Sequence, residues 1–350
     1  MATFNGSAPG EGEVRAGSRV LSVFENPLNT RILRAHAEGP QRLSELQEKV
    51  GWSAQTTVRV ALANLCEIGA LTKQAVAESP YAVATVLTPA GEEMLSVADE
   101  IEAWLALSPD GPIDPEAEHA KGAVKALAGG WSSTLMRVLA SRPFTLTELD
   151  NLIPDLSYPS LERRISWMRA TGQIEPVERE GRGTPYVVTD WLRHAIAPLA
   201  VAGRCERRHM GDEGGPITDV EIEASFMLVT PIAPLPPYAN GTCMLASQTD
   251  PIEPDEKNPG LAGVTIEVRK GQVVSCVPEV GKEPTTWAIS SPETWLDVVI
   301  DGRVQDLRIG GARPQLAADL VHGLHLALFD AQLPGPSDGD LKRSSSATFL

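Results

Sequence analysis

"TLMRVLASRPFTLTELDNLIPDLSYPSLERRISWMRATGQI", residues 134–174, is a second version of an earlier part of the same chain. A shift of 103 positions aligns it without a gap on residues 31–71, "RILRAHAEGPQRLSELQEKVGWSAQTTVRVALANLCEIGAL". The apolar positions that both versions share recur at helical spacing. A constant offset with matching turn residues predicts a tandem duplication of one structural unit. Positions that keep the same residue include Arg34/Arg137, Ala37/Ala140, Pro40/Pro143, Leu43/Leu146, Glu45/Glu148, Leu46/Leu149 and Gly69/Gly172.

Both versions show the same order of secondary-structure signals. A first amphipathic helix ends before a proline, and a second begins at a stretch typical of a capping box. A third helix follows a serine that can act as N-cap and runs to a glycine, and two short strands and a further helix come next. Helix, helix, helix and hairpin is the order of a winged helix-turn-helix unit. The deciding signals are Gly39-Pro40 and Arg142-Pro143, "LSELQ" (43–47) and "LTELD" (146–150), Ser53 and Ser157, and Gly69 and Gly172.

Residues 131–199 resemble the HxlR family of bacterial winged-helix regulators, and the first version resembles a more distant member of the same MarR/HxlR-like group. The resemblance implies DNA binding. Two features depart from the family: HxlR proteins are usually single modules that form dimers, and many have a cysteine before the first helix, which neither version has.

The N-terminal part of the third helix reaches base edges in such a domain, and the wing lies along the DNA backbone or in the minor groove. Hydroxyl, amide and guanidinium groups at these positions can contact phosphates or bases. The alternative is a solvated helix face whose arginines pair with Glu162 or another neighbouring carboxylate. The second version has arginines in its third helix and its wing and is expected to bind DNA more strongly. The first version either binds DNA more weakly or serves as a structural partner. The candidate DNA-binding residues are Ser53, Gln55, Thr56, Thr57, Arg59, Ser157, Tyr158, Ser160, Arg163, Arg164, Arg179 and Arg182.

The net charge of −16 is distributed unevenly along the chain. Residues 1–112 carry −6, residues 113–210 carry +1 and residues 211–350 carry −11. Such a balance opposes general affinity for nucleic acid and indicates that the parts of the chain have different roles.

From about residue 217 the pattern changes to that of an α+β domain. Residues 220–229 alternate like a strand, and residues 263–280 predict two strands joined at Lys270-Gly271. A short strand over 285–290, a helix within 291–302 and an amphipathic helix over 313–330 follow.

This C-terminal part resembles the sterol-carrier-protein type of domain, most closely over residues 285–330. The resemblance implies a sheet covered by helices around an apolar tunnel, and therefore a hydrophobic small-molecule effector. Core packing is the usual role of large apolar residues, and it is the alternative for each candidate. The candidate ligand-binding residues are Phe226, Met227, Trp287 and Trp295.

Other sites have weaker support. His322 and His325 have a spacing that can share a metal, but no third ligand is apparent, so no metal and no cofactor is expected. Cys205 lies beside three arginines, which would favour a reactive thiolate. Cys66 is expected to be a buried thiol. No run of ~18 apolar residues and no signal-peptide pattern is present, so we expect a cytoplasmic protein with no membrane contact.

The sequence therefore predicts an α+β chain: two tandem winged helix-turn-helix modules followed by an α/β sterol-carrier-type ligand domain. The expected function is a one-component transcriptional regulator, with double-stranded operator DNA and a hydrophobic effector as partners and no enzymatic activity. The alternative is a small-molecule sequestering or carrier protein in which the winged helices are scaffold. An enzyme would need a nucleophile, base and acid set that is not found, and association of two chains as a homodimer stays open. The expected divisions are a disordered N-terminus (1–20), module 1 (21–112), module 2 (113–212), the ligand domain (217–332) and a disordered tail (333–350).

Overall fold

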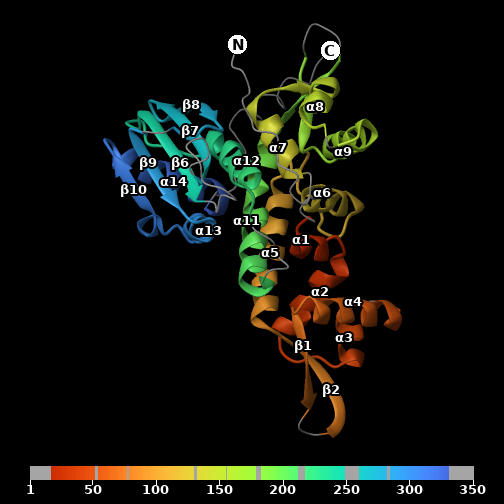
Figure 1. Cartoon of the computed structure of the whole chain (residues 1–350). Helices are drawn as coiled ribbons and strands as arrows, with labels where there is room; N and C mark the ends of the chain where they lie inside the picture. The colour runs from red at the N-terminus through yellow and green to blue at the C-terminus, as the bar shows by residue number, and fades with distance from the viewer. Residues whose placement is uncertain are drawn as a thin grey trace, which may run out of the picture.

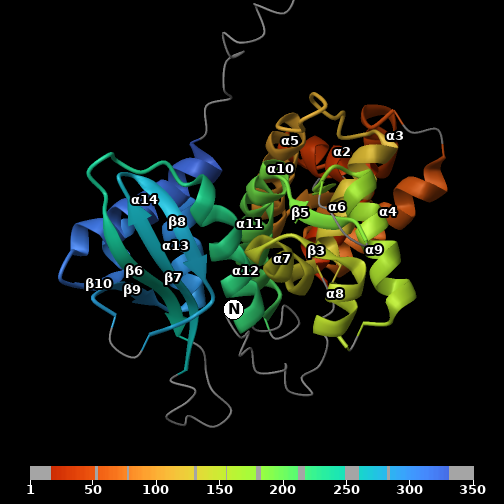
Figure 2. The ribbon, with the colours of Figure 1, turned by 90° about the horizontal axis from the view of Figure 1, so that it is seen from above.

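The computed structural model describes most of the chain and shows mixed helix and sheet in three parts (Figure 1). Two mainly helical segments follow one another, and a sheet-containing C-terminal domain packs beside them (Figure 2). The described residues are 17–51, 54–76, 79–129, 132–154, 156–178, 183–211, 217–248, 260–281 and 284–330.

The first segment has three core helices, a two-stranded antiparallel hairpin and a long closing helix. Buried leucines and isoleucine on α2 pack with apolar residues of α4 and α5 to form its core. Its elements are α1 (Arg19–Val23), α2 (Pro27–Ala37), α3 (Leu43–Lys49), α4 (Gln55–Glu67), β1 (Leu71–Val76), β2 (Ser79–Leu87) and α5 (Pro89–Ala106).

The second segment has the same order of elements, except that a short strand, β3, precedes its second core helix and its closing helix is divided in two. Pro198 lies in the first turn of the second half, and a proline there cannot continue an uninterrupted helix from the preceding residues. Its elements are α6 (Glu118–Ala128), α7 (Ser132–Ser141), β3 (Phe144–Thr145), α8 (Leu146–Leu152), α9 (Tyr158–Ala170), β4 (Ile174–Pro176), β5 (Pro185–Val188), α10 (Asp190–His194) and α11 (Ile196–His209).

Thr88 and Thr189 make matching hydrogen bonds in the two segments. The Thr88 hydroxyl donates to the Gly69 carbonyl at 2.6 Å and accepts from the Gly91 amide at 3.1 Å. The Thr189 hydroxyl donates to the Gly172 carbonyl at 2.9 Å and accepts from the Leu192 amide at 3.3 Å. In each case one threonine fixes the end of the third helix and caps the closing helix.

The start of α4 differs from the expectation. Ala54, rather than Ser53, stands at the N-cap of α4, and Ser53 lies outside the described residues. The offset of 103 pairs Ala54 with Ser157, which is the N-cap of α9. The Ser157 hydroxyl donates to the Ser160 hydroxyl at 3.0 Å and makes no capping bond to the helix backbone.

The closing helices of the two segments lie side by side, so α5 packs along α11 (Figure 1). The short helix α1 likewise packs on α6, its counterpart at the same offset. Equivalent elements therefore meet equivalent elements, which is the arrangement of an isologous, two-fold interface. Here both halves of that interface belong to one chain.

The C-terminal domain is a five-stranded sheet with the strand order β10-β9-β6-β7-β8. Strands β6 and β9 are parallel and the other neighbours are antiparallel. Lys270 and Gly271 both have positive φ at the predicted turn between β7 and β8, as a two-residue hairpin requires. Its elements are α12 (Asp219–Val229), η2 (Thr230–Ile232), β6 (Gly241–Gln248), β7 (Leu261–Arg269), β8 (Gln272–Val277), β9 (Thr286–Ser290), α13 (Pro292–Asp301), η3 (Val304–Asp306), β10 (Arg308–Gly311) and α14 (Pro314–Phe329).

The predicted strand over residues 220–229 is wrong, because this stretch is helix α12. Thr218 and Glu221 form a capping box at its start: the Thr218 amide donates to Glu221 Oε2 at 2.8 Å, and the Glu221 amide donates to Thr218 Oγ1 at 3.3 Å. The helix packs between α7 and β7, so apolar residues are buried around most of its circumference. A helix that is buried on all sides loses the one-sided pattern by which helices are recognised.

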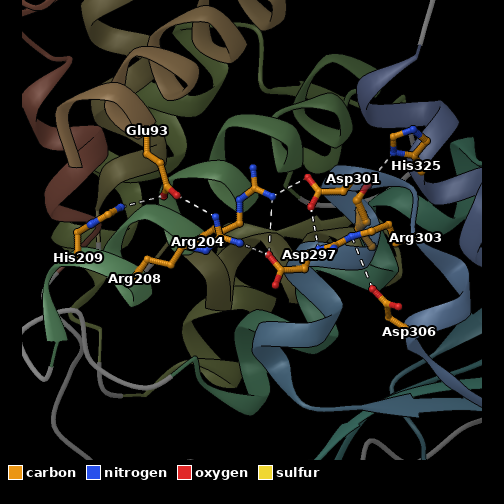
Figure 3. A network of polar contacts seen from close by, with 10 residues as sticks. Glu93, Arg204, Arg208, His209, Asp297, Asp301, Arg303, Asp306 and His325 are labelled. Carbon is orange, nitrogen blue, oxygen red and sulfur yellow. Dashed lines mark hydrogen bonds and ion pairs between the residues drawn. The ribbon is translucent and has the colours of Figure 1, made fainter. Parts of the chain in front are cut away.

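Charged side chains of α11 join the C-terminal domain to both segments (Figure 3). Arg208 donates to Glu93 of α5 at 2.8 Å and to Asp297 of α13 at 2.6 Å. Arg204 donates to Asp301 of α13 at 2.8 Å. Helix α11 is therefore in contact with the first segment on one side and the C-terminal domain on the other.

Candidate functional site

The first half of α4 presents a polar surface. Gln55, Thr56, Thr57 and Arg59 are all exposed, while Val58 is buried with Ala61 and Leu65 on the inner face of the helix. Val60, which is 61% exposed, lies on the same outer surface. Sequence reasoning missed Val60, although the offset of 103 places it opposite Arg163 in the second segment.

The first half of α9 presents a comparable surface. Ser157, Tyr158 and Arg163 are exposed and Ser160 is half-buried, whereas Leu161 and Ile165 face the core. Polar side chains at the exposed N-terminal turns of a third helix suit contact with DNA bases and phosphates.

The side chain of Arg164 points in a different direction from that of Arg163. It is half-buried, and a Cβ placed on Gly129 would lie 2.4 Å from its Nη1, so the guanidinium rests against the end of α6. Burial, followed by the charge of Arg163, lowers the pKa of Arg164 below its ordinary value. The structure thus directs Arg163, rather than Arg164, towards solvent.

The exposed arginines of α4 and α9 differ from other arginines of the chain in their ion pairing. Carboxylates engage Arg34 and Arg142 in the two helical segments and Arg204 at the junction with the C-terminal domain. Arg59 and Arg163 have no ion-pair partner among the residues that the structure describes. Their charges are consequently available to a polyanion without the loss of an internal salt bridge.

The wings are described in part. Lys73 and Val83 are exposed on the hairpin β1–β2 of the first segment. Arg179 and Arg182, predicted at the wing tip of the second segment, lie outside the described residues.

Helices α4 and α9 lie on the side of the molecule away from the C-terminal domain (Figures 1 and 2). This placement separates their exposed cations from the C-terminal domain, whose described residues include more acidic than basic side chains. Acidic groups that lie far from a cationic surface weaken its attraction for a polyanion less than acidic groups beside it would.

A cavity of about 180 Å³ lies where the second segment meets the C-terminal domain. Leu127, Met136 and Leu199 line it from α6, α7 and α11, and Phe226 and Trp295 line it from α12 and α13. The rings of Phe226 and Trp295 meet edge to face with centroids 4.9 Å apart. Of the four predicted ligand-binding residues, Phe226 and Trp295 line this cavity and Met227 and Trp287 do not.

The thiols are poorly suited to redox sensing. Cys205 is buried, and burial raises the pKa of its thiol to about 12, so the thiol stays protonated near neutral pH. The arginines beside it in sequence are bound to carboxylates across the helix junctions. Cys66 is half-buried, and burial raises the pKa of its thiol also.

The described residues show neither a metal cluster nor a membrane helix. His322 is exposed, while His325 Nδ1 lies 2.9 Å from the Val299 carbonyl oxygen. No group of three potential ligands comes together in this part of the chain. None of the described helices has the length and apolar character needed to cross a bilayer.

Comparison with known proteins gives one family match. Residues 25–109, which contain α2 to α5 and the hairpin, match the family described as HxlR-like helix-turn-helix. No curated protein matches the chain. The chain therefore contains a helix-turn-helix domain of a kind found in DNA-binding transcription regulators, and the match falls on the first segment, which the sequence had marked as the more distant member.

Proposed function

We propose that the chain is a one-component transcriptional regulator in which both helical segments are winged helix-turn-helix modules that bind operator DNA. The matching threonine caps and the equivalent bridges Gln41–Thr85 and Phe144–Tyr186 support a common architecture. The observation that carries the proposal is the polar surface of α4 and α9, with unpaired Arg59 and Arg163, on one side of the molecule.

The pairing of α5 with α11 gives one chain the arrangement that other regulators reach by dimerisation. Dimeric helix-turn-helix proteins present two recognition helices to half-sites about one helical turn apart, ~34–36 Å. The two helices here differ in sequence, with Gln55, Thr57 and Val60 on α4 opposite Tyr158, Ser160 and Arg163 on α9. The operator should therefore have two unlike halves.

The C-terminal domain is proposed as a sterol-carrier-like domain that holds a hydrophobic effector. The cavity beside Phe226 and Trp295 supports this role, because it also contacts α11, the helix that pairs the two segments. A ligand that prefers one position of α11 would shift the equilibrium between arrangements of α4 and α9, and so would change DNA affinity.

The test is selection of binding sites from a random DNA pool with the purified full chain at ~50–100 mM salt, where phosphate contacts are favoured. A recovered motif whose binding is lost with Arg163→Ala supports the proposal. Arg308→Ala is the matched control, since it removes an exposed arginine from β10 in the C-terminal domain. No enriched sequence would contradict DNA recognition.

The second candidate is a sequestering or carrier protein with a winged-helix scaffold. The net charge of −16 favours it, because a polyanion is repelled by such a chain. Ligand binding together with the absence of an enriched DNA motif would identify this function.

A further inference from the structure

The C-terminal half of α9 carries an exposed aromatic side chain. Trp167 is 45% exposed, and it lies one turn beyond Arg163 on the same face of the helix. Its indole N–H has no hydrogen-bond acceptor among the residues that the structure describes. Trp167 therefore offers both an apolar ring and a hydrogen-bond donor at the surface.

A lysine from a neighbouring helix lies over this ring. Lys125 Nζ of α6 is 5.3 Å from the centroid of the Trp167 ring, which is within the range of a cation–π contact. Lys125 is exposed, and no carboxylate of the described part of the chain pairs with it. Lys121, one turn earlier on α6, is in contrast paired with Glu118. The ring holds the Lys125 ammonium group in place and leaves its N–H donors free for an anion.

Helices α6 and α9 are held together close to this pair (Figure 1). The buried side chain of Gln173, just beyond the end of α9, donates to the Ala123 carbonyl of α6 at 2.9 Å. A Cβ placed on Gly122 would lie 3.5 Å from Thr171 Cγ2, so the backbone of α6 passes close to the end of α9. The positions of Lys125 and Trp167 are therefore set in advance, which lowers the entropy cost of binding through them.

The first segment has no counterpart of the pair. The offset of 103 places Ser22 opposite Lys125 and Asn64 opposite Trp167, and both of these residues are exposed. A contact made by Lys125 and Trp167 would therefore lie beside α9 alone, and would add to the difference between the two segments.

Phosphate is the chemical group that suits both side chains. An ammonium group and an indole N–H are donors, and the phosphate oxygens are the charged acceptors of duplex DNA. The N-terminal turns of a third helix meet base edges in the major groove, whereas in the homeodomain variant of this fold the C-terminal end of that helix contacts the backbone. Arg163 and Trp167, one turn apart, can thus meet a base edge and a phosphate of the same duplex.

We propose that Lys125 and Trp167 form a binding site for a backbone phosphate of duplex DNA beside the half-site of α9, an assignment that rests on the proposed function. The site fixes the position of α9 on the duplex. It carries no sequence information itself, because every base pair presents the same phosphate.

The salt dependence of DNA binding tests the site. Dissociation constants of the full chain are measured by fluorescence anisotropy on the selected operator and on an unrelated duplex of equal length, from ~50 to ~200 mM salt. Lys125→Gln should weaken binding to both duplexes by about threefold to tenfold, and should reduce the slope of log Kd against log salt by about one. Lys270→Gln is the matched control, because it removes the same charge from the exposed turn between β7 and β8.

Two substitutions separate the contribution of the ring from that of its N–H group. Trp167→Phe keeps a ring under Lys125 but loses the donor, so binding should weaken by about twofold to fivefold while the salt slope stays the same. Trp167→Ala removes the ring as well, and should weaken binding by as much as Lys125→Gln does. Circular dichroism identifies the folded variants. DNA binding by folded Trp167→Ala that equals that of the unmodified chain would contradict the shared site.

Neutral phosphate analogues locate the contact on the DNA. Replacing single phosphates of the operator by methylphosphonates removes one charge at a time. One position beside the α9 half should weaken binding of the unmodified chain but leave Lys125→Gln unaffected, because the two changes remove the same contact. Additive losses at every position would overturn the proposal.

Failure of this site and failure of the regulator give different results. An operator bound equally by Lys125→Gln and Lys270→Gln would reject the phosphate site and leave the regulator standing. DNA binding without sequence preference, with the salt slope reduced in Lys125→Gln alone, would reject the regulator and leave the phosphate site standing. No measurable binding of either duplex at ~50 mM salt, where phosphate contacts are favoured, would overturn both.

Discussion

Trp104 of α5 and Trp191 of α10 stack with ring centroids 4.5 Å apart and planes inclined by 7°, and each indole bonds to the other residue's backbone. The Trp104 indole donates to the Trp191 carbonyl at 2.9 Å, and the Trp191 indole donates to the Trp104 carbonyl at 2.8 Å. Thr88 and Thr189, which cap the closing helices, are 101 positions apart. The same offset pairs Trp104 with Cys205 and Ala90 with Trp191. The Cys205 thiol lies 3.9 Å from the Ala90 carbonyl, so the same contact recurs with smaller side chains.

Replacing one tryptophan of this pair should weaken the junction between the two segments. Trp104→Phe keeps an aromatic ring but leaves the buried Trp191 carbonyl without its donor, so we expect a loss of about 2–3 kcal/mol in the free energy of unfolding. Urea denaturation measures it. Trp167→Phe is the control: Trp167 is 45% exposed on α9, and its replacement should change stability by less than about 0.5 kcal/mol. Equal effects of the two substitutions would show that the stacked pair has no special role.

The contacts of Asp297 predict salt-sensitive docking of the C-terminal domain. Asp297 accepts from Arg208 at 2.6 Å and lies 3.7 Å from Arg204, at a partly exposed junction. Asp297→Asn should lower the free energy of unfolding by about 0.5–1 kcal/mol at low salt and by less at 0.5 M salt, where exposed charges are screened. Parallel denaturation at the two salt concentrations tests this. Asp306→Asn should have less effect, because Asp306 pairs at 3.6 Å with Arg303 inside the same domain.

The local elements were predictable where chain chemistry determines them. Helix α8 begins at the predicted stretch 146–150, with a capping box formed by Glu148 and the preceding Thr145, and Ser291 and Gly302 bound α13 as expected. These features depend on residues within a few positions of one another, and their backbone preferences are intrinsic.

Features that depend on distant contacts were not predictable in the same way. Helix α12 resembles a strand in sequence because both of its sides are buried, by α7 and by β7. The cavity draws Met136, Leu199, Phe226 and Leu324 from stretches far apart in the chain. One local signal was available: Ala200 and Gly203 are small residues three positions apart on α11, and they leave room on the face that borders the cavity.

His36 predicts a loss of stability in mild acid. Its Nδ1 lies 2.7 Å from the Ile32 carbonyl and its Nε2 2.7 Å from the Thr85 hydroxyl, and burial lowers the pKa of the imidazole below 6.5. In the unfolded chain the His36 imidazole takes up a proton as the pH falls below about 6.5, whereas in the folded chain it does so only at a lower pH. The free energy of unfolding therefore decreases as the pH falls through this window. One such group contributes at most about 1.4 kcal/mol per pH unit.

Chemical denaturation from pH 7.5 to 5 measures this effect. His36→Gln, which keeps a donor and an acceptor, should have a shallower fall in stability below pH 6.5 than the unmodified chain. His119→Gln, at an exposed position on α6, should leave the fall unchanged. A pH profile of His36→Gln identical to that of the unmodified chain would contradict the assignment.

The proposed function predicts that α4 and α9 contact different halves of one operator. Arg59→Ala and Val60→Ala on α4 should relax the sequence preference in one half, and Arg163→Ala on α9 should relax it in the other, each at a cost of about 1–3 kcal/mol in binding. Val60 is well placed for an apolar contact such as a thymine methyl, so Val60→Arg should shift its half of the motif towards guanine. Site selection with each variant measures the changes.

Five base pairs inserted between the halves turn one half to the opposite side of the duplex, and should abolish tight binding if a single chain holds both helices. Unaltered affinity for the lengthened site would mean that the two segments bind DNA independently.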